Sequence, residues 1–115
     1  MGMNNVKVYP VPIASGASTS TAIDLCHGYS KVVFDPTGAA GSTMFFAAPT
    51  LDGTYRQVRH AISSGVSAPA TATVGSACSG SLVDVPALAG LRYVKVAADG
   101  TIANGVTLKL YCSDY

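Results

Sequence analysis

The sequence predicts an all-β fold, an antiparallel β-sandwich or jelly-roll-like barrel with about eight strands and an extended N-terminal arm. Three observations predict it. Only 11% of the 115 residues are charged, against about 25% in an average domain, and none is Glu, so helix surfaces lack their usual residues. Apolar and polar residues alternate in short segments, as in half-buried strands. Turn residues separate these segments at roughly 8–12-residue spacing, as in a sandwich.

The chain is predicted to divide into an arm, residues 1–20, and a single sandwich domain, residues 21–115. Pro10 and Pro12 exclude a helix from the arm and keep segment 6–13 out of the middle of a sheet. That segment is therefore either an edge strand or an arm that lies across a neighbouring subunit as an added strand. The residues that follow it, ASGASTST, have the composition of a linker.

Two segments near the C-terminus have the clearest strand pattern. One is 91–98, where Val94 and Val96 face the same side. The other is 106–112, where polar residues alternate with an inward set, which is Val106, Leu108, Leu110 and Cys112. Further strands are expected, in chain order, at 21–25, 31–35, 43–48, 55–62, 71–77 and 81–85, with at most one helical turn at 85–90.

Residues that could perform chemistry do not form a recognisable group. The acids are all Asp, and Asp35, Asp52 and Asp99 stand beside turn signals, where an Asp side chain caps the turn. We find no nucleophile motif, phosphate-binding loop or dense calcium loop. The protein is therefore predicted not to be an enzyme and to need no cofactor or metal. Two surface histidines and three buried, reduced thiols without a CxxC pair are expected, the thiols being Cys26, Cys78 and Cys112.

The charge and the hydropathy pattern limit the classes of partner. A net charge of +1 gives no general attraction to nucleic acid or to an anionic membrane. No apolar run approaches the about 18 residues of a transmembrane helix, and the first residues lack the apolar core of a signal peptide, so we expect synthesis in a cytoplasm. A weakly charged surface rich in Ala, Ser, Thr and Gly is poorly protected against association, which indicates that part of it is covered in the working state.

Four segments, in this order and at this spacing, resemble a group of small virion proteins of tailed bacteriophages. They are TAIDL (21–25), GYSKVVFDP (28–36), TMFFAAPTLDGTYRQV (43–58) and GLRYVKV (90–96), and the resemblance covers about residues 12–112. That group commonly has an Ala-Ile-Asp-Leu strand, a valine-rich strand ending in Pro, an apolar strand leading into Asp-Gly-Thr and an aromatic residue, and a Gly-x-Arg-Tyr-x-Lys strand. This chain departs from the pattern at Pro49-Thr50-Leu51, where a Ser usually precedes the Asp-Gly turn, and the turn type stays open.

The resemblance implies a β-sandwich on the surface of the virion capsid. Within that group we expect a head decoration, or cement, protein that binds the major capsid protein, assembles as a homotrimer and is made in the cytoplasm of the bacterial host. A carbohydrate-binding sandwich on the tail or baseplate is the alternative. Exposed aromatic side chains on one flat face would favour that alternative.

The predicted contact residues are those whose types are favoured at protein interfaces, Tyr and Arg. Asp52-Gly53 is predicted to form a tight turn with Gly53 at positive φ, after which Tyr55 begins a strand. Tyr55 then either contacts a partner or packs over its own strand pair. The full set of predicted contact residues is Tyr9, Tyr55, Arg56, Arg59 and Tyr93.

Overall fold

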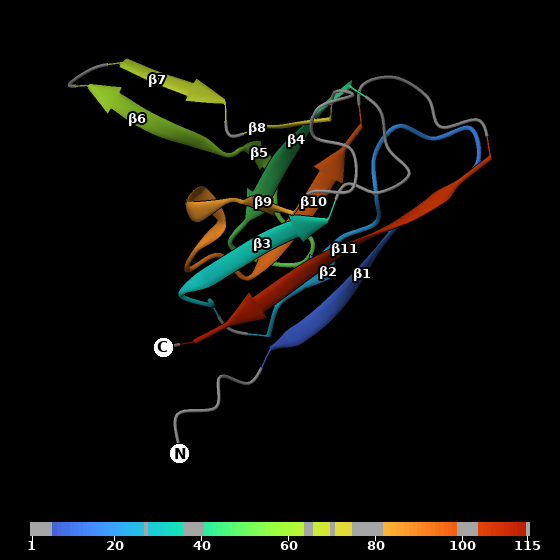
Figure 1. The fold of residues 1–115 in the computed structure, drawn as a ribbon, viewed down its shortest axis with the longest axis horizontal. Helices are drawn as coiled ribbons and strands as arrows, with labels where there is room; N and C mark the ends of the chain where they lie inside the picture. The colour runs from blue at the N-terminus through green and yellow to red at the C-terminus, as the bar shows by residue number, and fades with distance from the viewer. Residues whose placement is uncertain are drawn as a thin grey trace.

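The computed structural model describes residues 6–26, 28–35, 41–63, 66–69, 71–74, 82–98 and 104–114. Two antiparallel sheets form two layers, and a hairpin of β6 (Arg59–Ser63) and β7 (Val66–Pro69) extends beside them (Figure 1). The all-β sandwich that the sequence predicts is confirmed. Within the described ranges, no helix has the length and apolar character needed to span a membrane.

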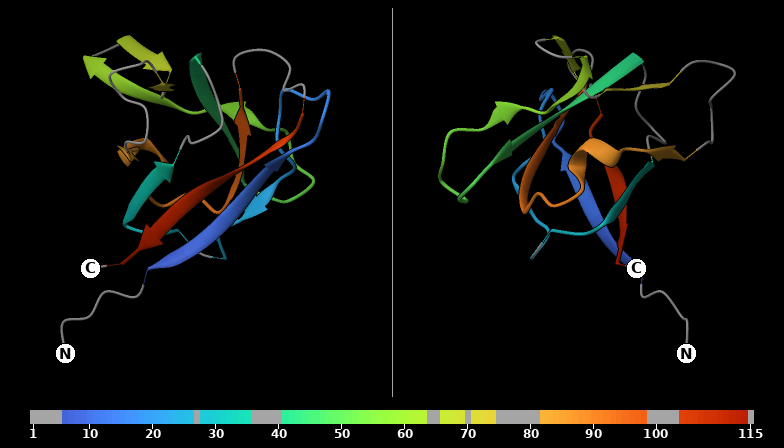
Figure 2. Two further views of the ribbon diagram at one scale, coloured as in Figure 1. Left: turned by 45° about the vertical axis from the view of Figure 1, so that its right-hand side comes forward. Right: turned by 90° about the vertical axis from the view of Figure 1, so that its left-hand side faces the viewer.

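Each sheet brings together strands that are distant in the sequence. The first sheet, which we call sheet A, has the order β1 (Lys7–Ile13), β11 (Val106–Ser113), β3 (Lys31–Asp35) and β9 (Val83–Asp84). The second, sheet B, has the order β2 (Ile23–Asp24), β10 (Tyr93–Ala97), β4 (Gly41–Ala48) and β5 (Arg56–Gln57), and β8 (Thr71–Val74) also pairs with β4. The two layers are seen from the side in Figure 2.

The pairing is nested from the ends of the chain inward. β1 pairs with β11, β2 with β10 and β3 with β9, and β4 pairs with both β5 and β8. The chain therefore crosses between the sheets as it advances, which is the arrangement of a double-sheet jelly roll. Most of the pairings join residues far apart in sequence, so the fold depends on the core between the layers rather than on local hairpins.

Alternating side chains build that core. Val94 and Val96 are fully buried, as the pattern of segment 91–98 predicts. In β11, Leu108, Leu110 and Cys112 are buried, whereas Val106 at the strand's start is only partly covered. The layers meet where the rings of Phe34 in β3 and Phe45 in β4 pack edge to face, with centroids 5.2 Å apart and planes at 90°. Such a pair adds about 0.5–1.5 kcal/mol beyond its burial.

Segment 6–13 is resolved in favour of the edge strand. Residues Lys7–Ile13 of β1 pair over their whole length with β11, and Val11 and Ile13 are in the core. The chain then continues along β10, because Thr19 bridges Ala97 and Ser20 exchanges hydrogen bonds with Val96, from the Ser20 N–H (2.8 Å) and to the Ser20 hydroxyl (3.0 Å). The boundary predicted at residue 20 is therefore wrong for residues 7–20, which belong to the sandwich.

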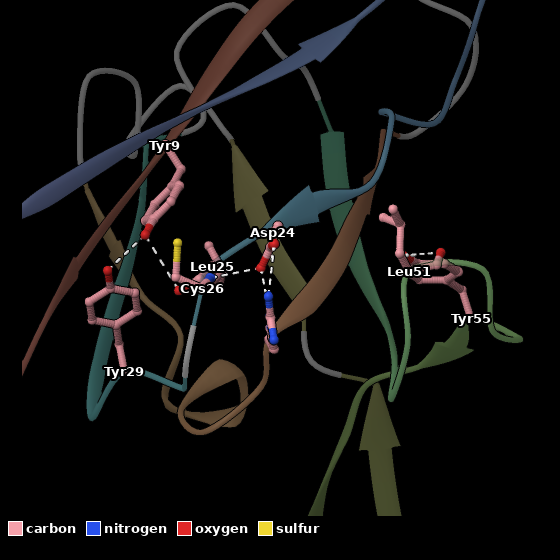
Figure 3. A network of polar contacts seen from close by, with 8 residues as sticks. Tyr9, Asp24, Leu25, Cys26, Tyr29, Leu51 and Tyr55 are labelled. Atoms are coloured by element: carbon pink, nitrogen blue, oxygen red, sulfur yellow. Dashed lines mark hydrogen bonds and ion pairs between the residues drawn. The ribbon is translucent and has the colours of Figure 1, made fainter.

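The turn that contains Gly28 lies against the turn that contains Gly90, and a hydrogen-bonded pair of tyrosines is buried beside them. The hydroxyls of Tyr9 and Tyr29 lie 2.7 Å apart and share a hydrogen bond, and the Tyr9 hydroxyl lies 3.4 Å from the Leu25 carbonyl (Figure 3). Burial, together with the bond to Tyr29, raises the pKa of Tyr9 far above its usual range. The single helical turn expected at 85–90 is the 3-10 turn η2 (Pro86–Leu88), and after it the Gly90 N–H donates to the Tyr29 carbonyl at 2.9 Å.

Three local predictions were wrong. The strand expected at 55–62 is divided at Val58, which is buried and donates to the Phe45 carbonyl at 2.7 Å, so β5 and β6 join different sheets. β7 lies in a segment that the sequence left without a strand. Cys26 is exposed rather than buried, because it lies in the turn after β2 with φ at 66°. Cys78, His27 and Asp99 lie outside the described residues, as does the side chain of His60.

Candidate functional site

The outward side of sheet B gathers aromatic and charged side chains in cross-strand rows. Tyr93 of β10 lies between Asp24 of β2 and Ala48 of β4 in register. Lys95 lies beside Phe46, which in turn faces Gln57 of β5. We call this surface the β10 face and define it by Asp24, Met44, Phe46, Tyr55, Gln57, Arg59, Arg92, Tyr93 and Lys95.

Asp24 and Arg92 form the first fixed group on the β10 face. The Arg92 Nε donates to Asp24 Oδ1 at 2.9 Å and Nη2 to Oδ2 at 3.2 Å, which is a two-point contact (Figure 3). Asp24 Oδ1 also accepts the Cys26 N–H at 2.8 Å. These donors hold the pKa of Asp24 below its usual range, and the carboxylate in turn raises the pKa of Arg92. The guanidinium also lies over the Tyr93 ring, 4.8 Å from its centroid.

Tyr55 and Lys95 form the second group. The Lys95 ammonium lies 4.4 Å from the centroid of the Tyr55 ring, within the range of a cation–π contact. The Tyr55 hydroxyl donates to the Leu51 carbonyl at 3.0 Å, so the ring is held at both its face and its tip. Partial burial, followed by the nearby charge of Asp52, raises the pKa of Tyr55.

The turn before Tyr55 differs from the one predicted. The Gly53 N–H donates to the Thr50 carbonyl at 3.1 Å, so Leu51 and Asp52 are the central residues and Gly53 is the last. Gly53 is not among the residues with positive φ. Instead, a Cβ at this position would lie 2.8 Å from the Thr50 hydroxyl oxygen. The nearest backbone atom to that Cβ would be the Thr50 carbonyl oxygen at 3.3 Å.

The remaining members of the β10 face lie along β5 and β6. The Gln57 amide nitrogen lies 3.1 Å from the Met44 sulfur. The Gln57 carbonyl oxygen accepts a hydrogen bond from Arg59 Nη1 at 3.0 Å. Gln57 therefore links the guanidinium of Arg59 to the outward side of β4 and orients it along the face.

The structure brings together three of the five predicted contact residues: Tyr55, Arg59 and Tyr93. Arg56 is exposed, but it is opposite Ala47 in register and so lies on the other side of β5 from Gln57. Tyr9 is only 8% exposed and points toward Tyr29 in the interior, so its predicted contact role is wrong. Sequence reasoning did not assign contact roles to Lys95 and Arg92. The same alternation that placed Tyr93 outward would have identified Lys95.

The β10 face carries more positive than negative side chains. Three cations, Arg59, Arg92 and Lys95, accompany one carboxylate, Asp24, so the face is net positive. The groups with a resolved pKa shift in the described part of the chain all move away from neutral pH. No group of three or more His, Cys, Asp or Glu residues in these ranges is placed to hold a metal ion.

Comparison with known proteins found no matching family model, no matching curated protein and no matching solved structure. The fold and the β10 face therefore rest on the residues and contacts of this chain.

Proposed function

We propose that this chain is a structural virion protein of a tailed bacteriophage, a decoration protein that binds the major capsid protein of the head through the β10 face. The observation that carries the proposal is where the phage-like segments lie in the fold. TAIDL provides Asp24, TMFFAAPTLDGTYRQV provides Phe46, Tyr55 and Gln57, and GLRYVKV provides Arg92, Tyr93 and Lys95. Segments distant in sequence thus supply one continuous outward surface as well as part of the core.

The β10 face has the composition of a contact surface. Tyr and Arg are enriched at interfaces because each offers large contact area or several donors at a small entropy cost. Here Asp24 already orients Arg92, and Lys95 already covers Tyr55, so less side-chain freedom remains to be lost on binding. A net positive face favours a carboxylate-rich site on the shell.

Binding to a shell would gain strength from repetition. A standard interface takes about 800 Å² from each partner, and buried apolar area contributes about 25 cal/mol per Å² before the cost of association. A homotrimer at a threefold position, as the resemblance implies, would engage three copies of the capsid protein together. Each contact is weak by itself, but once one subunit has bound, the contacts of the other two form at high effective concentration, so the trimer as a whole binds tightly. Neighbouring capsomers joined in this way would resist the internal pressure of packaged DNA.

The geometry of the tyrosines speaks against the alternative, a carbohydrate-binding module. A sugar-binding platform needs exposed aromatic ring faces on a flat surface. Tyr55 and Tyr93 do lie on the flat outward side of sheet B, but both are only partly exposed. The side chains of Lys95 and Arg92 already lie over their rings. A glycan array is the direct comparison, with no saturable binding expected.

The experiment that tests the proposal is co-sedimentation of the purified chain with capsid shells that lack it. The wild-type chain is expected to sediment with the shells, and Lys95→Met and Lys95→Glu to bind roughly tenfold more weakly or worse, because each removes a cation from the β10 face. Lys7→Glu is the matched control, since Lys7 is an exposed lysine at the start of β1 in the other sheet. A wild-type chain that stays in the supernatant, or that is missing from purified virions by mass spectrometry, would end the proposal.

A further inference from the structure

Large apolar side chains are exposed at both edges of sheet A, the layer opposite the β10 face. Four large apolar side chains are exposed within the described ranges: Val6 at 57%, Val8 at 45%, Leu51 at 52% and Leu82 at 58%. Val8 is on the outward side of β1, between the buried residues of that strand. Val6 comes directly before β1, and Leu82 comes directly before β9. Three of the four therefore lie in or directly before a strand of sheet A.

An apolar row crosses this side of sheet A from strand to strand. Val8 is opposite Tyr111 in β11, Tyr111 is opposite Val33 in β3, and Val33 is opposite Asp84 in β9. The next row runs from Pro10 through Lys109 to Asp35. We call this surface the β11 face and define it by Val6, Val8, Pro10, Pro12, Lys31, Val33, Asp35, Leu82, Asp84, Lys109 and Tyr111.

The free edge of β1 is unsuited to strand addition. Pro10 and Pro12 have no N–H, and they fit the continuous pairing of β1 with β11 only at positions whose N–H would point away from β11. The exposed edge therefore lacks donors at two alternate positions, which is a known protection against pairing with another strand. A partner on this side must pack on the face of the sheet rather than extend it.

The charges of the β11 face identify the partner. Lys31 pairs with Asp84 at 3.0 Å, and Lys109 faces Asp35 in register, so two cations and two carboxylates flank the apolar row. The face is neutral, in contrast to the net positive β10 face, and offers no attraction to an acidic or a basic partner. A surface that carries both signs around an apolar centre is complementary to a copy of itself. Contacts between identical chains are also the more apolar class of interface.

We propose that the β11 face is the surface through which copies of this chain contact one another. Two such faces would pack as sheets do in a sandwich, about 10 Å apart with their side chains interdigitated, and this pairing of two free chains is a contact separate from the threefold one proposed on a shell. With 7 residues in β1, 8 in β11, 5 in β3 and 2 in β9, at about 3.4 Å per residue and about 4.8 Å between strands, the face projects roughly 350 Å², less than half of what a standard interface takes from each partner. Association is therefore expected to be weak and to depend on concentration. This inference does not rest on the capsid proposal, because it concerns the free chain.

Sedimentation equilibrium of the full chain tests the proposal. The wild-type chain is expected to self-associate with a Kd between about 10 μM and 1 mM. Val8→Glu and Leu82→Glu each place a carboxylate in the apolar contact and should raise that Kd roughly tenfold or more. Leu51→Glu is the matched control, because Leu51 is equally exposed but lies on the turn before β5. Thermal melts of each variant in the dilute, monomeric range verify that the fold is unchanged.

Two results would overturn the proposal. One is a wild-type chain that sediments as a monomer at about 1 mM, where even a free energy of about −4 kcal/mol would be detected. The other is a Leu51→Glu variant that dissociates as much as Val8→Glu and Leu82→Glu, since exposure alone would then explain the effect. Because shell binding is measured separately with variants of the β10 face, failure here leaves the capsid proposal standing, and the reverse also holds.

Discussion

Replacing Gly28 by alanine should destabilise the protein far more than a glycine-to-alanine change on a surface turn normally does. A Cβ at position 28 would lie 2.4 Å from the Cα of Gly90, 2.5 Å from its carbonyl carbon and 2.6 Å from its carbonyl oxygen. All three atoms are backbone, so no side chain can rotate away. The two turns must then separate by about 1 Å to reach ordinary contact.

The magnitude follows from what that separation breaks. The Gly90 N–H donates to the Tyr29 carbonyl at 2.9 Å, and a shift of about 1 Å takes this pair beyond hydrogen-bonding distance. Losing the bond costs about 1 kcal/mol, and overpacking at a rigid contact costs about 1–3 kcal/mol. The lower entropy of the unfolded alanine chain returns about 0.4–1 kcal/mol. The expected net loss of unfolding free energy is about 1–3.5 kcal/mol, or roughly 4–14 °C in Tm.

Urea unfolding followed by circular dichroism measures this loss, and Gly90→Ala is the matched control on the other side of the crossing. Gly90 has φ at 82° and open space around its missing Cβ, so alanine there should cost only the left-handed backbone, about 1–2 kcal/mol. Gly90→Asn should recover part of that cost, because Asn tolerates this conformation. If Gly28→Ala unfolds within about 0.5 kcal/mol of wild type, the close crossing does not exist and the reasoning fails.

Three further predictions concern the interior. Tyr9→Phe and Tyr29→Phe should each lower stability by about 1 kcal/mol by removing the hydrogen bond that the two hydroxyls share, and the double variant should lose less than their sum; additive losses in urea unfolding would refute the shared bond. Raising the pH should destabilise the protein, because burial raises the pKa of Cys112 from 9.0 to about 11 and the pKa of Tyr9 above its ordinary 10.0. The stability that these groups contribute is present below their ordinary pKa values and is lost as the pH rises through the raised ones. Tyr9→Phe should flatten the loss above about pH 10, and an unchanged profile would contradict the assignment. In a Cys78→Ser background, a thiol reagent should label exposed Cys26 within the mixing time and buried Cys112 only on unfolding; peptide mapping that finds Cys112 labelled first would reverse the burial.

Alternation of apolar and polar residues was enough to predict the layers of the fold. It placed Val94, Val96, Leu108 and Leu110 in the core, because successive side chains of a strand point to opposite sides of the sheet. What it could not supply was the crossing of Gly28 and Gly90, which depends on two turns far apart in sequence. β7 was missed because Ser, Gly and Ala carry little strand signal, so its pairing with β6 depends on the hairpin.

The candidate site was predicted in part for the same reason. Tyr93 was expected to face away from Val94, and Tyr55 and Arg59 lie with it on the β10 face. Tyr9 was predicted to be a contact residue from its residue type alone, without regard to which side of the strand it occupies. Tyr9, Val11 and Ile13 share one side of β1, while Pro10 and Pro12 share the other, so the alternation already placed Tyr9 inward. The ion pair of Asp24 with Arg92 joins residues 68 positions apart in sequence, and no local pattern could reveal that contact.

The β10 face as the capsid-binding surface is tested most directly by a cryo-electron microscopy map of a virion that carries this chain. We expect a jelly roll on the outside of the head shell, with β10 and β4 against the major capsid protein and the side chains of Tyr93 and Lys95 covered. Density for the chain with sheet B facing solvent, or a complete map of the particle with no density for the chain, would contradict it.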